Sequence, residues 1–370
     1  MSRLNISRIQ NENEDGSAAV SGISTFSSTA FLQAPRGSTA QRPTNPQPGA
    51  IRFNTDSGHL EYFTGEFWDE ALVANNTLDG GNRGLFAGGY APSPTASSTI
   101  DYVTISSLGN ATSFGNLTDV RIGTFSCASS TRGLVAGGLK LPARLSTIDL
   151  ITFSSTGNAS SFGSLSQTRQ NGSSCSSNTR GVFAGGYAPG TVNTVDYVTI
   201  ASTGNAVSFG VLTGIRIDHS GCSSSTRGVF GGGFTPGALN TIDYITISTT
   251  GNAVSFGTLS AARFRSSSCS NSTRGLFGAG ATPTATNNIE FITIATLGSG
   301  TTFGELTFSG SYGAACSSST RGIFAAGLIP AISNRIDYVT IPTQSNSISF
   351  GNLTSSRYAI SSCSNGHGGL

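Results

Sequence analysis

The sequence predicts an all-β protein: a six-bladed β-propeller with four-stranded blades, preceded by an extended N-terminal segment with a small β-meander. Three observations lead to this fold: a tandem repeat, four strand-like runs in each copy, and an incomplete copy at each end. The pattern Thr-Arg-Gly-x-x-Ala-Gly-Gly recurs with small changes every 47 to 49 residues, which indicates one supersecondary unit copied along the chain. Its arginines are Arg83, Arg132, Arg180, Arg227, Arg274 and Arg321.

The chain before the repeats divides into two segments. Residues 1–33 are polar and weakly periodic, and residues 34–78 contain a connector followed by a meander. Prolines and glycines within 34–49 predict an extended connector. Alternation of apolar and polar residues predicts strands at 50–55, 59–64 and 67–72. Because a three-stranded meander is marginal alone, we expect it to gain a core by association with copies of itself or with another protein.

Residues 79–370 contain the repeats. In the third copy, four short runs of β-branched, aromatic or small residues are separated by turn signals. These runs, a to d, are 173–177, 181–187, 194–200 and 206–212. Four strands in about 47 residues is the content of one propeller blade. Gly-Gly pairs and the absence of a 3.6-residue period oppose helix.

The two ends of the repeat region complement each other. The first b-c-d set, which begins at Arg83, has no run a before it. The last run a, at 358–365, has no run b after it. We therefore expect the C-terminal strand to complete the first blade, which leaves no open sheet edge. Run a consists of the smallest residues because the inner strands of a propeller crowd its axis.

Composition and charge exclude several kinds of partner. Charged residues make up 10% of the 370 residues, and the formal net charge is +2. This charge is too small to attract nucleic acid or a membrane surface over long range. No apolar run approaches the about 20 residues that span a bilayer, and the start lacks the apolar core of a secretory signal. We expect no nucleic-acid partner, no membrane insertion, and assembly in a cytoplasm.

Each repeat contains one cysteine at the same place in run a. The six are Cys127, Cys175, Cys222, Cys269, Cys316 and Cys363. A cytoplasm keeps thiols reduced, and equivalent positions in separate units seldom come within bonding distance. We interpret them as small, buried, reduced side chains.

Run c carries an acidic residue in every copy. The series is Asp101, Asp149, Asp196, Asp243, Glu290 and Asp337. Catalysis needs one asymmetric pair of carboxylates, so six equivalent ones indicate a structural role between blades, accepting backbone or arginine hydrogen bonds. Candidate partners are the six repeat arginines and a second set, which alternatively are solvated strand ends. That second set is Arg121, Arg169, Arg216, Arg263 and Arg357, with Gly310 in the sixth place.

Other constellations that carry chemistry are absent from the sequence. The three histidines, His59, His219 and His367, lie far apart with no cysteine or carboxylate pattern around them. We therefore predict no metal site and no cofactor. No Ser-His-Asp set and no Gly-Lys-Ser/Thr phosphate loop stands out. The chain is predicted not to be an enzyme.

Comparison of the repeats with each other identifies a candidate binding surface. The a–b and c–d turns are near copies, whereas the b–c loops and d–a connections differ. Strand directions place the first group on one face, the uniform face, and the second on the opposite, varied face. Since loops on a rigid scaffold carry function, the varied face is the predicted binding surface, and it should point away from the N-terminal segment. Its candidate contacts are Tyr90, Lys140, Arg144, Tyr187, Phe234 and Arg335.

The segment before the repeats resembles a module of bacteriophage tail-fibre proteins. The shared features are Gly-Ser-Thr-Ala-Gln-Arg-Pro at 37–43, Gly-Ala-Ile-Arg-Phe-Asn-Thr-Asp at 49–56, Leu-Glu-Tyr-Phe at 60–63, and Phe67-Trp68. The resemblance covers about 40 residues and implies a virion appendage, often trimeric at this point. A generic β-meander linker is the alternative interpretation.

The repeats resemble kelch-type propellers. A Gly-Gly pair closes run b, Ile-Asp-Tyr follows in run c, and Leu-x-x-x-Arg comes last, as at 212–216. The Trp typical of run d is replaced by Phe, so the resemblance concerns shape and not function. Similar repeats occur in phage fibre and structural proteins, notably those of cyanophages.

These observations lead to three functional hypotheses. The first is a virion appendage, a tail or neck fibre: residues 1–33 attach to the particle, residues 1–78 bind other virion proteins and oligomerise, with a trimer favoured, and the propeller binds a host-surface glycan or protein. The second is a purely structural virion protein, such as a collar, cement or baseplate component. The third is a propeller glycosidase, which would need two carboxylates in one cleft.

Overall fold

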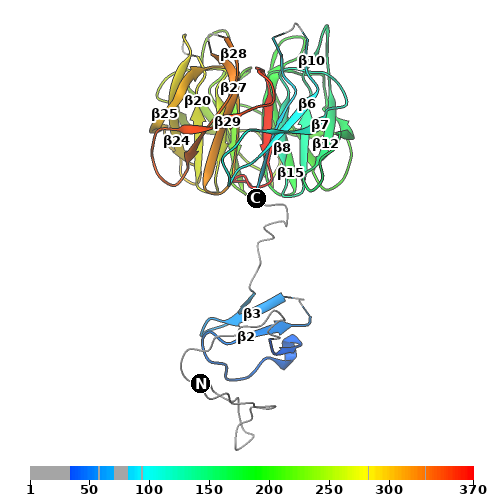
Figure 1. The fold of residues 1–370 in the computed structure, drawn as a ribbon, viewed down its shortest axis with the longest axis vertical. Helices are drawn as coiled ribbons and strands as arrows, with labels where there is room; N and C mark the ends of the chain where they lie inside the picture. The colour runs from blue at the N-terminus through cyan, green and yellow to red at the C-terminus, as the bar shows by residue number, and fades with distance from the viewer. Residues whose placement is uncertain (1–33, 57–58, 71–81, 93–94, 282, 330) are drawn as a thin grey trace, which may run out of the picture. The chain divides into compact units, whose positions relative to one another are not determined.

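The structure is a computed structural model, which describes residues 34–56, 59–70, 82–92, 95–281, 283–329 and 331–370 (Figure 1). The predicted all-β class is confirmed, because these residues form strands apart from one 3-10 turn. The chain divides into two compact units, Met1–Ala74 and Asn75–Leu370, whereas the sequence placed the boundary at 78/79. The predicted attachment segment, 1–33, lies outside the described residues.

The N-terminal unit contains one four-stranded sheet in the order β1-β2-β3-β4. Its elements are β1 (Arg36–Gly37), the 3-10 turn η1 (Thr39–Gln41), β2 (Ile51–Asn54), β3 (His59–Phe63) and β4 (Trp68–Glu70). Strands β2 to β4 are the predicted meander. The predicted connector is not simply extended: β1 runs parallel to β2, and the amide of Phe53 donates to the carbonyl of Pro35 over 2.7 Å.

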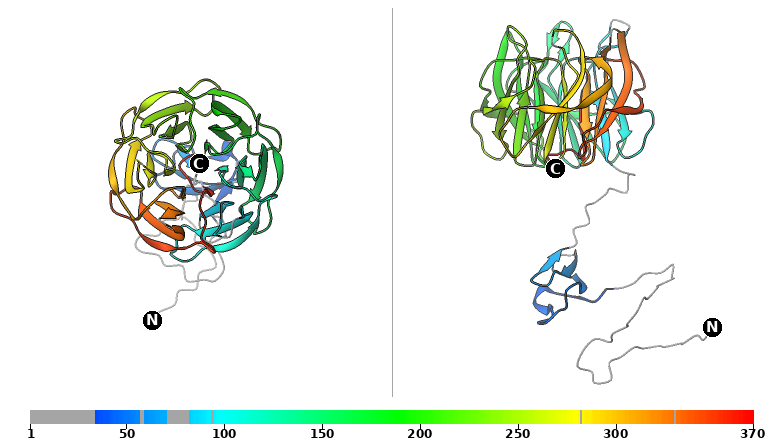
Figure 2. Two further views of the ribbon diagram at one scale, coloured as in Figure 1. Left: turned by 90° about the horizontal axis from the view of Figure 1, so that it is seen from above. Right: turned by 90° about the vertical axis from the view of Figure 1, so that its left-hand side faces the viewer.

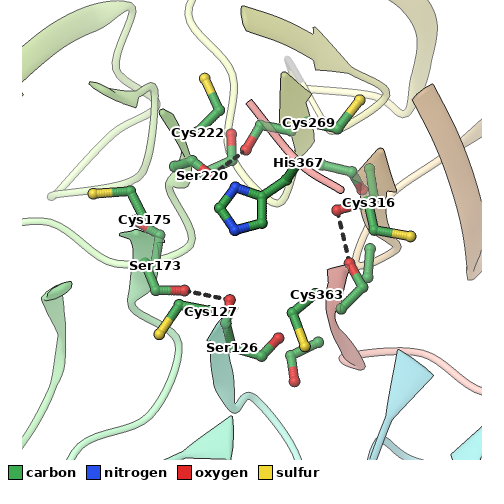
Figure 3. Close-up of a pocket in the computed structure, with 18 of the residues that line it drawn as sticks. Ser126, Cys127, Ser173, Cys175, Ser220, Cys222, Cys269, Cys316, Cys363 and His367 are labelled. Carbon is green, nitrogen blue, oxygen red and sulfur yellow. Dashed lines mark hydrogen bonds between the residues drawn. The ribbon is translucent and has the colours of Figure 1, made fainter. Parts of the chain in front are cut away.

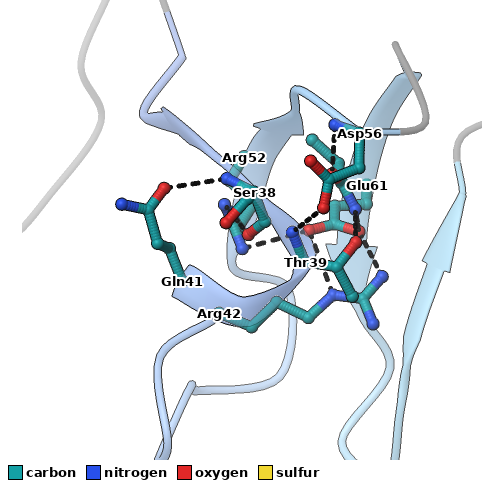
Figure 4. A network of polar contacts seen from close by, with 8 residues as sticks. Ser38, Thr39, Gln41, Arg42, Arg52, Asp56 and Glu61 are labelled. Atoms are coloured by element: carbon teal, nitrogen blue, oxygen red, sulfur yellow. Dashed lines mark hydrogen bonds and ion pairs between the residues drawn. The ribbon is translucent and has the colours of Figure 1, made fainter.

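The two faces of this sheet are reversed relative to an ordinary half-buried sheet. Along β2 and β3, the polar residues Arg52, Asn54 and Glu61 are buried. The Glu61 carboxylate accepts from Arg42 Nη2 over 2.6 Å and from Asn54 Nδ2 over 3.1 Å, and Figure 4 shows this network beside the η1 segment. The opposite face exposes the apolar side chains of Ile51, Phe53, Leu60 and Tyr62.

The described residues of the C-terminal unit form four-stranded antiparallel sheets, here named I to VI. Sheet I contains β30 (Ser361–Ser364), β5 (Arg83–Ala87), β6 (Thr99–Thr104) and β7 (Thr112–Asn116). Sheet II contains β8 (Phe125–Ala128), β9 (Arg132–Ala136), β12 (Thr147–Thr152) and β13 (Ser160–Ser164). Sheet III contains β14 (Ser173–Ser176), β15 (Arg180–Tyr187), β16 (Thr191–Thr199) and β17 (Val207–Val211), which match the predicted runs.

The remaining three sheets follow the same order. Sheet IV contains β18 (Ser220–Ser223), β19 (Arg227–Gly231), β20 (Thr241–Thr246) and β21 (Val254–Thr258). Sheet V contains β22 (Ser267–Ser270), β23 (Arg274–Gly278), β24 (Thr286–Thr293) and β25 (Thr301–Gly310). Sheet VI contains β26 (Ala314–Ser317), β27 (Arg321–Ile329), β28 (Ala331–Thr340) and β29 (Ile348–Asn352). A two-stranded hairpin, β10 (Leu139–Lys140) and β11 (Ala143–Arg144), lies between β9 and β12.

The sheets lie side by side around a central axis (Figure 2). Their innermost strands contact one another in the order β30, β8, β14, β18, β22, β26 and again β30. Sheet I combines the two ends of the repeat region: β30 pairs with β5, with Ser361 opposite Ala87. The sequence predicted this pairing from the unmatched last run a.

Serine hydroxyls connect the innermost strands. Ser176 Oγ donates to the carbonyl of Ala128 over 2.8 Å, and Ser223 Oγ donates to the carbonyl of Ser176 over the same distance. The same bond recurs from Ser270, Ser317 and Ser364. The inner strand of each of these sheets has no strand partner on its axial side, so these hydroxyls satisfy carbonyls that no strand pairs with. This explains why serine, and not only small size, marks run a.

The cysteines are free and buried, as the sequence predicted. Each sulfur packs against the glycine that follows the repeat arginine in the next sheet. A Cβ added at Gly181 would lie 2.6 Å from Cys127 Sγ, and one at Gly228 would lie 2.3 Å from Cys175 Sγ. The Arg-Gly step is therefore required by close packing between sheets.

Candidate functional site

The two predicted faces are present in the C-terminal unit. Strand β5 begins with Arg83 on the uniform face and leads to Gly88 and Gly89 on the varied face. In Figure 1 the β10 hairpin lies at the opposite end of the strands from the C-terminus, which is on the uniform face. The b–c connections, which differ between repeats, therefore lie together with the d–a connections.

The repeat arginines bind backbone carbonyls of the neighbouring sheet. Arg132 Nη1 in sheet II donates to Ile200 O over 3.1 Å and to Ala201 O over 2.6 Å in sheet III. Equivalent bonds come from Arg83, Arg180, Arg227, Arg274 and Arg321. This series lies between blades as predicted, but its partners are carbonyls and not the acidic residues.

The acidic series pairs with the second arginine set. Arg169 Nη2 lies 2.7 Å from Asp196 Oδ2, and both side chains are buried. Arg169 Nη1 also donates to the carbonyls of Gly185 and Thr194, at 3.1 and 2.8 Å, so the connection from sheet II is fixed onto sheet III. The other pairs are Arg121–Asp149, Arg216–Asp243, Arg263–Glu290 and Arg357–Asp101.

Sheet VI solves the same problem without a buried arginine, because Gly310 takes its place. Asp337 accepts instead from Thr307 N at 2.8 Å, Thr307 Oγ1 at 2.6 Å and Ser347 Oγ at 2.8 Å. The place of Ser347 is taken by alanine in sheets I to IV and by Gly300 in sheet V. A Cβ at Gly300 would lie 2.5 Å from Glu290 Oε2, so this glycine accommodates the longer acid.

The predicted contacts on the varied face do not form one cluster. Lys140 Nζ pairs with Asp119 Oδ1 at 2.7 Å. The guanidinium of Arg144 lies 4.5 Å from the ring centroid of Tyr187. Arg335 was expected in a loop, but β28 extends through that region, and its Nε lies 3.7 Å from Asp337 Oδ1. Arg335 is therefore part of a strand.

Tyr90 and Phe234 belong to a larger set of aromatic contacts on this face, here called the aromatic arc. Starting at sheet IV, its members are Phe234, Phe264, Arg265, Tyr312, Tyr358 and Tyr90. Neighbouring members are in contact: the guanidinium carbon of Arg265 lies 4.8 Å from the Phe264 ring and 4.1 Å from the Tyr312 ring. The two tyrosine pairs have ring centroids 5.8 and 5.4 Å apart.

A ring of main-chain hydrogen bonds surrounds the axis at the varied face. It is formed by the residues two or so places before each inner strand, and each amide donates to the carbonyl of its equivalent in the preceding repeat, over 2.7 to 3.1 Å. These residues are Gly123, Asn171, Asp218, Arg265, Tyr312 and Ala359. All six have backbone φ between 53° and 63°, the left-handed region. Because main-chain atoms alone make the ring, the side chains at these positions are free to differ.

The ring and the residue that follows each member enclose a hollow of about 80 Å³, here called the mouth hollow. The carboxylate of Asp218, which is almost fully buried, accepts from Arg265 Nε over 3.2 Å. Burial raises the pKa of Asp218, although Arg265 opposes this shift. Burial and the nearby Asp218 charge raise the pKa of the Tyr312 hydroxyl to about 12. The hydroxyl of Tyr312 therefore remains protonated and is a hydrogen-bond donor at neutral pH.

Below the mouth hollow, a channel of about 170 Å³ follows the axis between the innermost strands. The imidazole of His367 lies in it, and the cysteine sulfurs point away from this ring (Figure 3). His367 Nε2 lies 2.9 Å from Ala128 O and 3.2 Å from Ser176 Oγ, and burial lowers its pKa. These partners lie at the uniform-face end of the inner strands, so the histidine narrows the channel at that end.

Sequence comparison of the repeats found the varied face but not the mouth hollow. Asp218, Arg265 and Tyr312 escaped because a left-handed backbone is not readable from Arg or Tyr. A signal was present: no other aligned position near run a contains six different residues, from Gly123 to Ala359.

Comparison of the sequence with models of known protein families gave no match, and no curated protein matches it either. In the part of the chain that the structure describes, no helix is long and apolar enough to cross a membrane. Among the same residues, no group of three or more His, Cys, Asp or Glu side chains could hold a metal ion. The functional interpretation therefore depends on the geometry of the two units.

Proposed function

We propose that the chain is a structural virion appendage, a tail or neck fibre, that displays a closed six-bladed β-propeller for attachment to the host surface, with glycan as the bound class. In this proposal sheets I to VI are the blades. The pairing of β30 with β5 and the cyclic order of contacts between inner strands support closure. The tail-fibre-like segment at 37–68 supports the virion assignment.

One observation carries the attachment function: a repetitive scaffold ends in an asymmetric mouth. The buried arginine–carboxylate pairs, serine hydroxyls and cysteine–glycine contacts recur from sheet to sheet. At the mouth, six equivalent positions with one backbone conformation hold six different side chains. Side-chain variation on a repeated backbone is what a binding surface on a rigid scaffold requires.

The N-terminal sheet supports assembly into a homo-oligomer, with a trimer favoured. Its face with Ile51, Phe53, Leu60 and Tyr62 is apolar and exposed, whereas its polar side chains are buried. Exposed contiguous apolar surface typically marks a protein contact. The occupant in this proposal is the same face of further copies, and residues 1–78 also bind other virion proteins.

Labelled antibodies against the chain test the appendage assignment on purified particles of the virus that encodes it. Electron microscopy should place the label on tails or necks, and fluorescently labelled full-length protein should adhere to host cells. Label on the particle without any adhesion would replace this proposal by the purely structural alternative. No label on intact particles would refute the virion assignment.

Self-association is tested with Ile51→Asp, measured by light scattering after size-exclusion chromatography. Val254→Asp is the matched control, because Val254 is 55% exposed in the C-terminal unit and Ile51 is 54% exposed. The wild type and Val254→Asp should have the mass of the oligomer, and Ile51→Asp should be monomeric. A monomeric wild type would refute the oligomer.

A further inference from the structure

The mouth hollow contains side chains that its backbone does not favour. Left-handed φ is readily adopted by Gly, Asn and Asp, whereas other L-residues pay about 1–2 kcal/mol. Gly123, Asn171 and Asp218 suit their positions, but Arg265 (φ 57°) and Tyr312 (φ 59°) do not. Since the ring of hydrogen bonds uses main-chain atoms, neither side chain is needed to close it. Their presence in a strained conformation indicates a role for the side chains themselves.

Arg265 and Tyr312 lie beside an acceptor that is held in place. The carboxylate of Asp218 is fixed by Arg265 Nε at 3.2 Å, and the guanidinium of Arg265 is stacked 4.1 Å from the Tyr312 ring. Arg265 is about one-third exposed, so its remaining N–H groups face the hollow or solvent. The hollow therefore presents a carboxylate acceptor, guanidinium donors and a phenol close together.

A buried histidine adds polar atoms to the floor of the hollow. His219 follows Asp218, lines the hollow and is only 4% exposed. Neither of its ring nitrogens has a hydrogen-bond partner in the protein. Burial lowers its pKa, so the ring is neutral and offers one donor and one acceptor. Buried polar atoms normally find partners, and a hydroxyl-bearing ligand supplies them.

The charge of the hollow excludes two ligand classes. Its titratable groups are Asp218, Arg265, Tyr312 and His219, and with the latter two neutral the sum is zero. An anionic ligand would meet the Asp218 carboxylate, while Arg265 is already engaged by it. A cationic ligand would need a free aromatic face, but Arg265 covers that of Tyr312. A neutral ligand rich in hydroxyls remains.

Shape and surroundings define that ligand further. The hollow of about 80 Å³ has room for about three water-sized groups such as hydroxyls. The aromatic arc lies beside it, with Tyr312, Tyr358 and Tyr90 on one side and Phe264 and Phe234 on the other. Aromatic faces carry negative charge and attract the weakly positive C–H bonds of a sugar ring.

We propose that the mouth hollow binds the hydroxyl-bearing edge of one neutral pyranose residue, with Asp218 and Arg265 as hydrogen-bond partners and Tyr312 as the aromatic platform. Vicinal hydroxyls each donate and accept, which matches an adjacent carboxylate and guanidinium. This inference rests on the proposed attachment function and narrows it to a site and a sugar class.

The test uses full-length protein and a panel of defined probes, followed by saturation-transfer NMR and titration. Neutral probes are the methyl pyranosides of glucose, galactose, mannose and N-acetylglucosamine. Charged probes are N-acetylneuraminic acid, glucuronic acid and choline. At least one neutral pyranoside should bind, and the charged probes should not compete with it.

Two variants and a matched control locate the site. Asp218→Asn and Tyr312→Asn should each weaken binding about tenfold or more, the loss expected for a hydrogen bond to a charged group. Asparagine suits the left-handed backbone, so thermal unfolding should occur at the same or higher temperature. Tyr187→Asn removes another arginine-stacked tyrosine of the varied face, outside the hollow, and should leave affinity within twofold.

Several results would overturn this inference. They are preferential binding of a charged probe, pyranoside affinity unchanged in Asp218→Asn and Tyr312→Asn, or an equal loss in Tyr187→Asn. If no pyranoside binds and the full-length protein still adheres to host cells, the sugar site is refuted and the attachment function stands. If adhesion is absent as well, both proposals fail.

Discussion

The buried pair of Arg169 and Asp196 gives the sharpest test of how the sheets are held together. Replacing Arg169 by methionine preserves bulk but leaves a carboxylate at 0% exposure without its cation. Removing one partner of a buried pair typically costs about 3–5 kcal/mol. Asp196 keeps two donors, Ser166 N at 3.3 Å and Ser166 Oγ at 2.7 Å, so we expect the low end, about 3 kcal/mol.

Sheet VI supplies the matched rescue. There Ser347 donates to Asp337, which has no buried arginine partner, and Ala206 is the equivalent of Ser347 in sheet III. Ala206→Ser in the Arg169→Met background should recover about 1–2 kcal/mol through a hydrogen bond to a charged acceptor. In the wild type the same substitution should be neutral or destabilising, because Asp196 is already paired.

The assay is equilibrium urea unfolding followed by far-UV circular dichroism. The lone tryptophan, Trp68, lies in the N-terminal unit and does not report on the sheets of the other unit. The four proteins of the cycle should show a coupling energy of at least about 1 kcal/mol. A cost below about 1 kcal/mol for Arg169→Met, or strict additivity, would refute the assigned role of the buried pair.

Three further outcomes are expected. Gly181→Ala should destabilise the C-terminal unit by about 2 kcal/mol, because its Cβ would lie 2.6 Å from Cys127 Sγ, and Cys127→Ala should relieve most of this loss in urea titrations. Burial raises the pKa of Cys222 to about 12, so Ellman's reagent should label the native protein only at the rate of unfolding; fast labelling would contradict the packing. Hydrogen bonding to Arg42 lowers the pKa of the buried Glu61 below 4.5, so its contribution to the stability of the N-terminal unit is present above that value and lost as pH falls through the lower folded value. Tryptophan fluorescence should show this acid transition, and Glu61→Gln should remove its pH dependence.

The sequence was sufficient for the strands and their order, because the repeat makes each assignment six times. It was not sufficient for the partners of the carboxylates. The Arg132 and Arg169 series recur with the same period, and only the path of each d–a connection determines which one reaches the buried acid. Sequence alone left both as candidates.

Two other features were hidden for local reasons. Alternation along β2 shows that the sheet has two faces, but the cover over Arg52 comes from the η1 segment, which reads as connector. At the mouth, Arg265 and Tyr312 adopt a backbone conformation that their residue types disfavour, so tertiary contacts override the local preference. The functional candidates lie where local rules fail.

The pairing of β30 with β5 sets an order of events during synthesis. Arg83 donates its amide hydrogen to Asn365, 282 residues later. At 5–20 residues per second, the ribosome needs roughly 15 to 55 s to make the intervening chain. Sheets II to V contain only strands that are consecutive in sequence, so each can form as it emerges, whereas the inner edge of β5 remains unpaired until the last repeat arrives. A nascent chain therefore carries one exposed strand edge throughout translation, and premature termination leaves it permanently open to pairing with another molecule.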